Sequence, residues 1–336
     1  MSILAGHPSS LLFGCIGIAL YAVIRLIALR SPMGHVLRCL FAGGFALVLS
    51  LAISAAQLLP FIEYMPEMAF FINRFFPEGV LHYTYSAYDL LGLWGPRILG
   101  TEHEGTFWGS TNHTYVGMLY PGVITWVGLS LLLSRLGLTR FDRVRVAALL
   151  ISSAIVTYLA TNFPYADFVQ KLPVIGGSRP AYFIAFTTFA LPWCAVYAIQ
   201  LWIDRRLPVR SLIRPAMTLG AVALVVAGAL ATAPYLSFEY IALHDKGVPI
   251  GSYIAVQWAL VSALAASTML LLGLCAVNPA RAKVAVAALS VLVVVDQSVG
   301  IHGLIATTPR RDVVPNTATT DYLRAQPAPT RVRFDT

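Results

Sequence analysis

The sequence predicts an all-α protein that crosses a membrane several times, and three observations support this fold class. Hydrophobic residues make up 58% of the 336 residues and charged residues only 11%, and the mean hydropathy is +0.74. This apolar content exceeds what the core of a water-soluble protein can bury. The apolar residues form continuous runs of roughly 20, the length that an α-helix needs to cross a bilayer. The runs do not alternate with polar residues, as the strands of a membrane barrel would.

Eight such runs are predicted as membrane-spanning helices, with ends placed to within about two to four residues. They cover residues 11–29, 39–61, 115–133, 146–160, 181–203, 216–236, 253–277 and 284–304. Residues 1–304 therefore form one transmembrane domain, in which 62–114 is a large connection. Residues 305–336 are polar and contain prolines, and we expect them to be an extracytoplasmic tail that begins a soluble domain. Because the tail stops abruptly and no signal peptide precedes the first span, we expect a fragment of a longer protein.

Basic residues are concentrated in alternate short connections between the spans. They are Arg30, Arg38, Arg135, Arg140, Arg143, Arg145, Arg205, Arg206, Arg210, Arg214, Arg281 and Lys283. Because cytoplasmic connections are rich in Lys and Arg, these mark the cytoplasmic side, and they explain the net charge of +8 without a nucleic-acid partner. The large connection and both termini are then expected outside the inner membrane of a bacterial cell. Arg310 and Arg311 in the tail run against this rule.

The large connection, residues 62–114, is the expected working surface. It is rich in aromatic residues, acids and histidines, and structureless loops of this length are often functional. Its apolar side chains predict short helices that lie in the membrane interface. These side chains are Met68, Phe70, Phe71, Phe75 and Phe76, and later Tyr88, Leu91 and Trp94.

Several motifs follow one another in a recognisable order. They are Ala5-Gly6-His7-Pro8, then Ala55-Ala56-Gln57-Leu58-Leu59-Pro60, then Trp94-Gly95-Pro96 with Tyr115-Val116-Gly117, then Leu172-Pro173 with Arg179-Pro180, and finally Asp296 before a tail that leads to Arg331-Val332. In this order the chain resembles the bacterial YfhO-like membrane proteins, a family related to the GT-C glycosyltransferases. The resemblance covers the chain from His7 to Val332.

The resemblance implies a GT-C-like C-terminal membrane portion that transfers a sugar on the outer face. The donor would be a polyprenyl-phosphate-linked sugar, and the acceptor a polymer or lipid of the cell envelope. The family's catalytic carboxylates lie in the first outer loop of the full protein, which would precede Met1. No residue of this chain is therefore assigned a catalytic role.

Such a transferase needs carboxylates for the acceptor, a cation for the donor phosphates and aromatic residues for the polyprenyl chain. The candidate substrate-binding residues are His7, Gln57, Glu63, Asp89, Arg97, Glu102, His103, Glu104, Arg179 and Asp296. Gln57 and Glu63 flank Pro60 and could line a cavity under the large connection. Residues 102–104 could also ligate a divalent cation, although three adjacent side chains reach one ion only through a tight turn. The alternative for them is a solvated loop.

Other candidates have structural alternatives that the sequence leaves open. Arg179 could bind a phosphate, or extend to the lipid headgroups from the end of its span. His7 could bind substrate, or belong to a turn before the first helix. Asp89 could bind the acceptor, or cap the helix that begins at Leu90. Asp296 lies about twelve residues into its span, where a functional role and a structural hydrogen bond are equally consistent with the sequence.

Three functions remain compatible with these observations. The first is the glycosyltransferase, or its C-terminal portion, with the lipid bilayer and the sugar donor and acceptor as partners. The second is a transporter or lipid flippase, because many spans with one intramembrane acid also suit transport, although no internal repeat is evident. The third is a non-catalytic membrane scaffold. The four cysteines lie in or beside spans without paired spacing, so they indicate packing rather than a zinc site.

Overall fold

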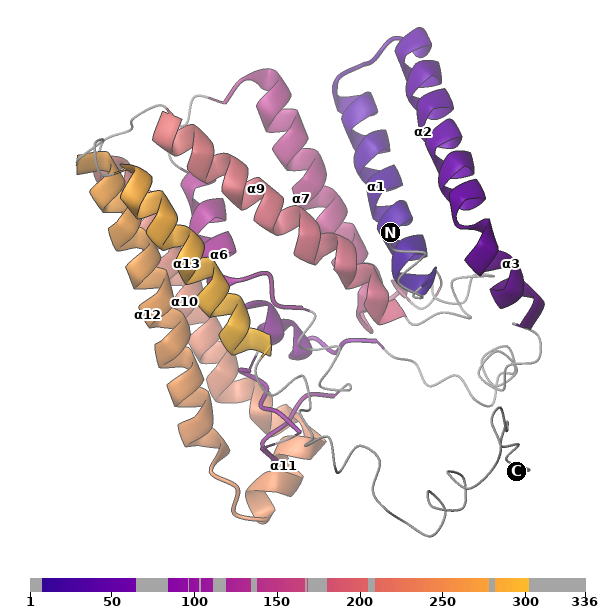
Figure 1. The fold of residues 1–336 in the computed structure, drawn as a ribbon. Helices are drawn as coiled ribbons and strands as arrows, with labels where there is room; N and C mark the ends of the chain where they lie inside the picture. Colours follow the sequence, from indigo (N-terminus) through magenta and orange to yellow (C-terminus); the bar gives the residue numbers. More distant parts are fainter. Residues whose placement is uncertain are drawn as a thin grey trace, which may run out of the picture.

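The structure of the protein is a computed structural model. It describes residues 8–64, 84–95, 97–102, 104–110, 119–133, 138–166, 168, 180–204, 209–277 and 282–301. Within these residues the structure is helical, and its one β-type feature is an isolated bridge between Tyr85 and Thr161. The long helices run side by side and alternate in direction (Figure 1). The predicted all-α architecture is therefore confirmed for the described part of the chain.

The helices agree broadly with the predicted spans. The α-helices are α1 (Pro8–Ala28), α2 (Met33–Ile53), α3 (Ala55–Tyr64), α6 (Val123–Ser130), α7 (Arg140–Ala160), α9 (Ile184–Asp204), α10 (Ile213–Thr232), α11 (Phe238–Asp245), α12 (Ile250–Val277) and α13 (Ala282–Ile301). The 3-10 helices are η2 (Asp89–Leu93), η3 (Leu131–Leu133), η4 (Pro180–Phe183), η5 (Val209–Leu212) and η6 (Ala233–Leu236).

Five segments of the described chain are long and apolar enough to cross a membrane. They are Met33–Ile53, Arg140–Ala160, Ala181–Asp204, Val209–Leu236 and Ile250–Cys275, and Phe13–Ala28 is a shorter apolar helix. A multi-pass membrane protein surrounded by lipid is thus supported. The count of eight spans stays a prediction.

Helix α7 begins six residues before the predicted start at Val146. Thr139 and Asp142 form a capping box in which the Thr139 hydroxyl accepts from Asp142 N at 3.2 Å and the Asp142 carboxylate accepts from Thr139 N at 3.2 Å. This reciprocal pair satisfies two backbone donors of the first turn. Arg140 therefore lies inside the helix rather than in the connection.

Two predicted spans are divided or shortened. The predicted span 39–61 breaks at Ser54, whose backbone N–H bonds to Ser50 O at 3.1 Å, and the chain continues as the separate α3. In the described part of the predicted span 115–133, the helix starts at Val123 with the short α6 and continues as η3. Residues 111–118 lie outside the described part. Periodicity alone indicates neither break, because both stretches remain apolar throughout.

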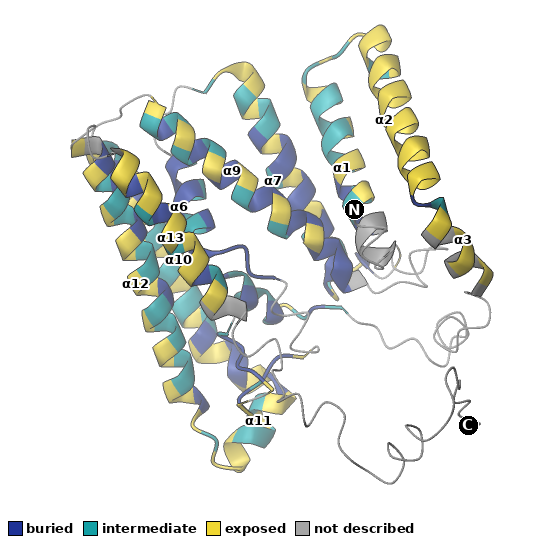
Figure 2. Ribbon diagram, viewed as in Figure 1, coloured by how far each residue is buried: buried dark blue, intermediate teal, exposed yellow. Residues whose placement is uncertain are grey.

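The core lies where α9 packs closely against both α6 and α7, while α1 packs against α7 and α12 against α13. The rings of Phe13 and Phe183 meet there with centroids 4.2 Å apart. Figure 2 shows buried residues concentrated in this region and exposed ones along α2, which has no buried residue. A helix that is apolar on all sides and exposed in the protein is expected to contact lipid.

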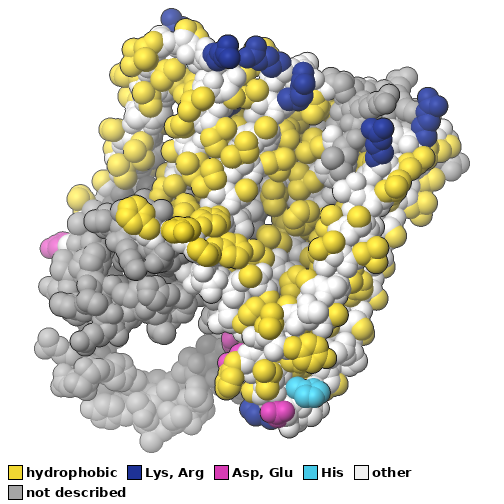
Figure 3. Space-filling model, turned by 180° about the vertical axis from the view of Figure 1, so that it is seen from behind, with side chains coloured by type: hydrophobic (Ala, Val, Ile, Leu, Met, Phe, Trp, Pro, Cys, Tyr) yellow, Lys and Arg dark blue, Asp and Glu magenta, His cyan; other side chains and the backbone are white. Residues whose placement is uncertain are grey.

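Charged residues separate between the two ends of the helices. Lys and Arg gather at the end that holds the α1–α2 connection and the starts of α7, α10 and α13, whereas most described acids lie at the other end, as Figure 3 shows from behind. Arg97 in the large connection and Lys246 at the end of α11 are the exceptions among the described residues on the acid-bearing end. This separation agrees with the predicted alternation of connections, and the sidedness itself stays a prediction.

The described part of the large connection is packed into the protein, which corrects one prediction. Trp94 is only 8% exposed and belongs to the main core cluster, and Tyr88 and Leu91 pack against that cluster. The buried Trp94 side chain is therefore not exposed to lipid headgroups, whereas Tyr88 and Leu91 are half-buried and their interfacial position stays a prediction. Tyr85 joins the connection to the end of α7, because Tyr85 N donates to Ala160 O and Asn162 N donates to Tyr85 O, both at 2.9 Å. Residues 65–83, with the other predicted interfacial aromatics, lie outside the described part, as does the tail 305–336.

Candidate functional site

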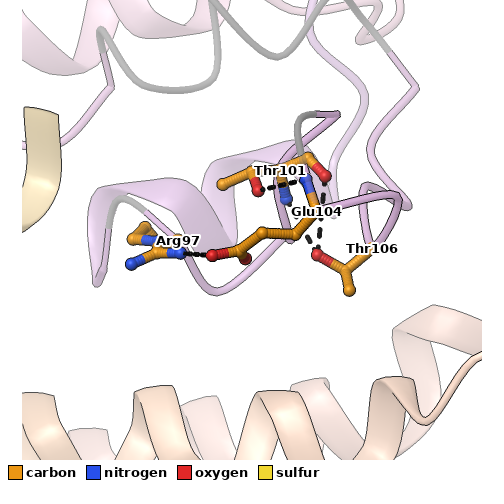
Figure 4. A network of polar contacts seen from close by, with 4 residues as sticks. All are labelled: Arg97, Thr101, Glu104 and Thr106. Atoms are coloured by element: carbon orange, nitrogen blue, oxygen red, sulfur yellow. Dashed lines mark hydrogen bonds and ion pairs between the residues drawn. The ribbon is translucent and has the colours of Figure 1, made fainter. Parts of the chain in front are cut away.

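A compact turn carries two acids of the large connection, Glu102 and Glu104. Trp108 N donates to Leu99 O at 2.9 Å and Thr106 N to Thr101 O at 3.0 Å, so the chain doubles back on itself. Thr101 N also donates to the Thr106 hydroxyl at 3.1 Å (Figure 4). Gly100 has φ +79°, and a Cβ on it would lie 1.9 Å from Thr106 O. Glycine is needed there for both its backbone angle and the close approach of the opposite chain. We call residues 97–110 the acidic turn.

Asp89 fixes the end of the acidic turn. Its carboxylate accepts from Ser86 N at 2.7 Å, from Ser110 N at 2.9 Å and from the Ser110 hydroxyl. Asp89 N in turn donates to the Ser86 hydroxyl at 3.3 Å. The side chain is fully buried, and burial, reinforced by its negative charge, raises the pKa of the neighbouring Tyr85 well above the ordinary value. The carboxylate thus joins Ser86 to Ser110 and does not form the predicted helix cap, because η2 begins at Asp89 itself and its N-cap residue, Tyr88, makes no side-chain cap hydrogen bond. The role in acceptor binding stays a prediction.

Ser237 ties the acidic turn to α11. Its hydroxyl donates to Trp108 O at 2.6 Å and accepts from Tyr240 N at 3.3 Å, so one side chain both caps α11 and holds the turn. The rings of Trp108 and Tyr240 pack edge to face with centroids 6.2 Å apart. Trp108 Nε1 donates to Ile98 O at 3.1 Å. These contacts fix the position of the acidic turn relative to α11, and the two segments form the two walls of a pocket.

A pocket of about 430 Å³ opens between these two walls. It is lined by Glu102, Gly105, Phe107, Gly109, Ser110, Glu239 and Leu243. Each wall contributes one exposed carboxylate, Glu102 from the turn and Glu239 from α11. Phe107 adds an aromatic ring, and none of the described lining residues is Lys or Arg. The volume falls in the range of about 300–1,000 Å³ that is typical of small-molecule sites. We call this cavity the acidic pocket.

Arg97 and Glu104 form an ion pair across the acidic turn (Figure 4). The Arg97 guanidinium also lies 6.0 Å from the ring centroid of Tyr253 on α12, and its Nε is buried without a hydrogen-bond partner. Burial acts to raise the pKa of Glu104, but the hydrogen bond and positive charge of Arg97 outweigh it and hold that pKa below its usual value. The pair is thus charged at neutral pH, with the Arg97 side chain 13% exposed and the Glu104 side chain 38% exposed.

Asp296 belongs to α13, and its side chain lies against the start of α6. Its carboxylate accepts from Val123 N at 2.8 Å and from the Tyr120 hydroxyl. A carboxylate at a helix N-terminus satisfies a backbone donor and interacts favourably with the helix dipole. Gly122 has φ +93°, and a Cβ there would lie 3.2 Å from Asp296 Oδ2 and 2.8 Å from Gln297 Nε2. The glycine therefore allows α13 to reach the α6 backbone.

A second cavity, of about 10 Å³, lies on the helix side of the acidic turn. Its lining includes Arg97, Tyr120, Gln257 and Asp296. A space of this size holds a single water molecule at most. Beside it, Trp94 stacks with Trp126 at 5.7 Å and with Trp258 at 6.0 Å between centroids. The aromatic stack and the small cavity both join the large connection to α12.

The structure brings together some of the predicted site residues. Glu102 lines the acidic pocket, Arg97 pairs with Glu104, and Arg97 and Asp296 line the same small cavity. Glu63 is exposed on α3, and it lines neither of these cavities. Its prediction as a cavity-lining residue is not supported by this placement.

The remaining predicted residues lie wholly or partly outside the described part. His7, His103 and Arg179 are not described, and Gln57 is placed in α3 without a described side chain. Their proposed roles stay predictions.

Four residues that build the site were not predicted as site residues: Phe107, Ser110, Ser237 and Glu239. Glu239 was recognisable as an acid in a later short connection, residues 237–252, which is predicted on the same side of the membrane as the large one. Ser237 precedes it as a helix N-cap residue type. No pattern in the sequence indicates that these two connections meet, because that contact joins residues 129 positions apart.

Metal binding receives no added support from the described residues. Among them, no group of three or more His, Cys, Asp or Glu side chains lies close enough to hold a metal ion. His103, the middle member of the proposed group, lies outside that part, so the divalent-cation hypothesis stays a prediction.

Comparison with known proteins identifies no relative: no family profile, no curated protein and no solved structure matches the chain.

Proposed function

We propose that the chain is the membrane portion of a glycosyltransferase that uses a polyprenyl-phosphate-linked sugar and modifies a cell-envelope acceptor. The observation that carries the proposal is the acidic pocket. Sugar-binding sites combine carboxylates, which accept hydrogen bonds from hydroxyl groups, with aromatic rings, which cover apolar faces of the sugar. In the acidic pocket Glu102 and Glu239 supply the carboxylates and Phe107 supplies the ring. In this proposal the protein lies in the bacterial inner membrane, with the acid-bearing end outside.

Arg97 is the proposed contact for the donor phosphate. A guanidinium binds phosphate through charge-assisted, often bidentate hydrogen bonds. Arg97 is held by Glu104 and Tyr253 at the junction of the acidic turn and α12, and its Nε has no partner. An anionic donor could therefore replace Glu104 as its partner.

The roles proposed for these residues are binding roles. Asp89 is fully buried within its own hydrogen bonds, and Asp296 is engaged by Tyr120 and the start of α6. Neither carboxylate is exposed to a reacting sugar. The catalytic carboxylates would come from an earlier outer loop of the full-length protein, as the resemblance to the YfhO-like family implies.

The binding of the donor tests this proposal. The full-length protein in lipid nanodiscs is titrated with a polyprenyl-phosphate-linked hexose. We expect Arg97→Gln to weaken binding about tenfold or more, because a charge-assisted contact is lost. Glu104→Gln removes the competing carboxylate and should leave donor binding unchanged or tighter. Arg214→Gln, at the opposite end of the helices, is the matched control.

Two results would contradict the proposal. One is the absence of saturable donor binding. The other is equal weakening by Arg97→Gln, Glu104→Gln and Arg214→Gln, which would indicate a nonspecific effect of charge.

A transporter remains the second candidate, because Asp296 and Arg97 line one small cavity beside the helices. Proton- or sodium-dependent uptake into vesicles that Asp296→Asn abolishes would favour this alternative over the transferase.

A further inference from the structure

The acidic pocket has a distinct charge. Its two carboxylates come from different walls, and no Lys or Arg is present among its described lining residues. A phosphate or a uronic acid in this pocket would lie beside two like charges, whereas an ammonium group would lie beside two opposite ones. We propose that the acidic pocket is the acceptor site and selects a carbohydrate that carries a free amino group. This proposal rests on the proposed glycosyltransferase function and names its acceptor class.

The walls of the pocket are already positioned for such a ligand. The Ser237 hydroxyl joins α11 to the acidic turn through Trp108 O, and Asp89 holds Ser110 at the far edge. The two backbone segments that carry Glu102 and Glu239 are thus held together by the fold rather than by the ligand. A ligand that binds between fixed walls orders only the side chains, which lowers the loss of conformational entropy.

The aromatic wall favours the same ligand. Phe107 is half-buried and lines the pocket, and the face of an aromatic ring attracts an ammonium group as well as the apolar face of a sugar. Ser110 already donates its hydroxyl hydrogen to Asp89, so towards the pocket this hydroxyl acts as an acceptor. An acceptor at that position suits an N–H donor.

The donor and the acceptor are expected to bind at two separate places of opposite charge. The donor phosphate is expected at Arg97, and the amine-bearing acceptor at the acidic pocket. The acidic turn carries residues of both places, since Arg97 and Glu104 lie in the same turn as Glu102 and Phe107. The pocket therefore discriminates against the donor by repulsion, which keeps the acceptor site available.

The test compares a glucosamine disaccharide with its N-acetylated counterpart, which is neutral but similar in shape. Binding to the full-length protein in nanodiscs is measured by calorimetry at low ionic strength. We expect the amine-bearing disaccharide to bind about 25-fold more tightly, from about fivefold for each carboxylate near water. Glu102→Gln and Glu239→Gln should each reduce this preference about fivefold, and the double variant should remove it. Asp245→Asn, an exposed acid of α11 outside the pocket lining, should retain the full preference.

Each outcome has a separate meaning. Preference for the amine that is lost in the double variant supports the proposal. Equal binding of the two disaccharides overturns the amine selectivity and leaves the proposed glycosyltransferase intact. Binding of neither disaccharide overturns this proposal, whereas failure of the proposed function itself is read from the donor titration. Displacement of the amine by millimolar Ca²⁺ or Mg²⁺, with direct binding of the metal alone, overturns the acceptor assignment in favour of a cation site.

Discussion

Replacing Asp296 tests whether this carboxylate is a structural cap or a functional group. In Asp296→Ala, the Tyr120 hydroxyl loses its acceptor in a buried place, because Asp296 is only 3% exposed. Val123 N–H loses the carboxylate as acceptor and keeps only its hydrogen bond to the Tyr120 hydroxyl at 3.0 Å. Hydrogen bonds to charged groups contribute about 1.5–3 kcal/mol each in soluble proteins, whereas polar pairs in a membrane protein average about 0.6 kcal/mol. Two hydrogen bonds to Asp296 are affected, and each contributes an amount between these limits. We therefore expect Asp296→Ala to lower the free energy of unfolding by about 2–4 kcal/mol.

Asp296→Asn should cost less, about 1–2 kcal/mol, because one side-chain oxygen remains as an acceptor while the charge at the helix N-terminus is lost. The assay is reversible unfolding of the full-length protein in mixed micelles, followed by circular dichroism. A double-mutant cycle with Tyr120→Phe should give a coupling energy of about 1 kcal/mol.

Ser290→Ala provides the control on the same helix. Ser290 is exposed and donates only to Val286 O at 3.1 Å within its own helix, so its loss should change stability by less than about 0.5 kcal/mol. If Asp296→Ala were as stable as Ser290→Ala, the carboxylate would not hold α6 as described. A stable Asp296→Asn protein that loses ion-dependent uptake would instead favour transport.

The remaining predictions concern the acidic turn and its attachment. Gly100→Ala should lower the free energy of unfolding by about 3 kcal/mol or more, because the added Cβ would clash with the backbone of Thr106. Gly105→Ala is the matched control. Gly105 also has a positive φ (+64°) but open space around it, so this change should cost about 1 kcal/mol in the same unfolding assay. Ser237→Ala should cost about 1–2 kcal/mol through loss of the cap and the tether, and should increase hydrogen exchange in α11. Because Arg97 lowers the pKa of Glu104, their pairing stabilises the protein above the unfolded pKa near 4.3 and is lost as pH falls through the lower folded value. Glu104→Gln should therefore flatten the stability profile in that acidic range, and an unchanged profile would contradict the pairing.

The sequence was sufficient to predict the class of fold and the arrangement of charge. Long apolar runs identify helices such as α10 and α12, because a bilayer imposes a length and a composition on each span. The separation of Arg-bearing and acid-bearing connections follows from the order of the runs. These properties are local or cumulative, so they do not require knowledge of distant contacts.

Distant contacts decide what the sequence could not predict. Val123 begins α6 where Asp296, 173 positions away, accepts from its backbone N–H. The acidic pocket needs the contact between Ser237 and Trp108. Trp94 looks amphipathic in its own segment, yet it stacks between Trp126 and Trp258 of two different helices. Local patterns predict exposure at the interface for such a residue, and the tertiary structure buries it instead.

The composition of the cell-envelope glycans tests the proposed function most directly. Glycans are compared by mass spectrometry between cells with the full-length gene, cells without it, and deleted cells that express Glu102→Gln/Glu239→Gln. The proposed function predicts that deletion removes one sugar substituent, that the intact gene restores it, and that the double variant restores it poorly. Identical glycans in all three strains across growth conditions would contradict a role in sugar transfer.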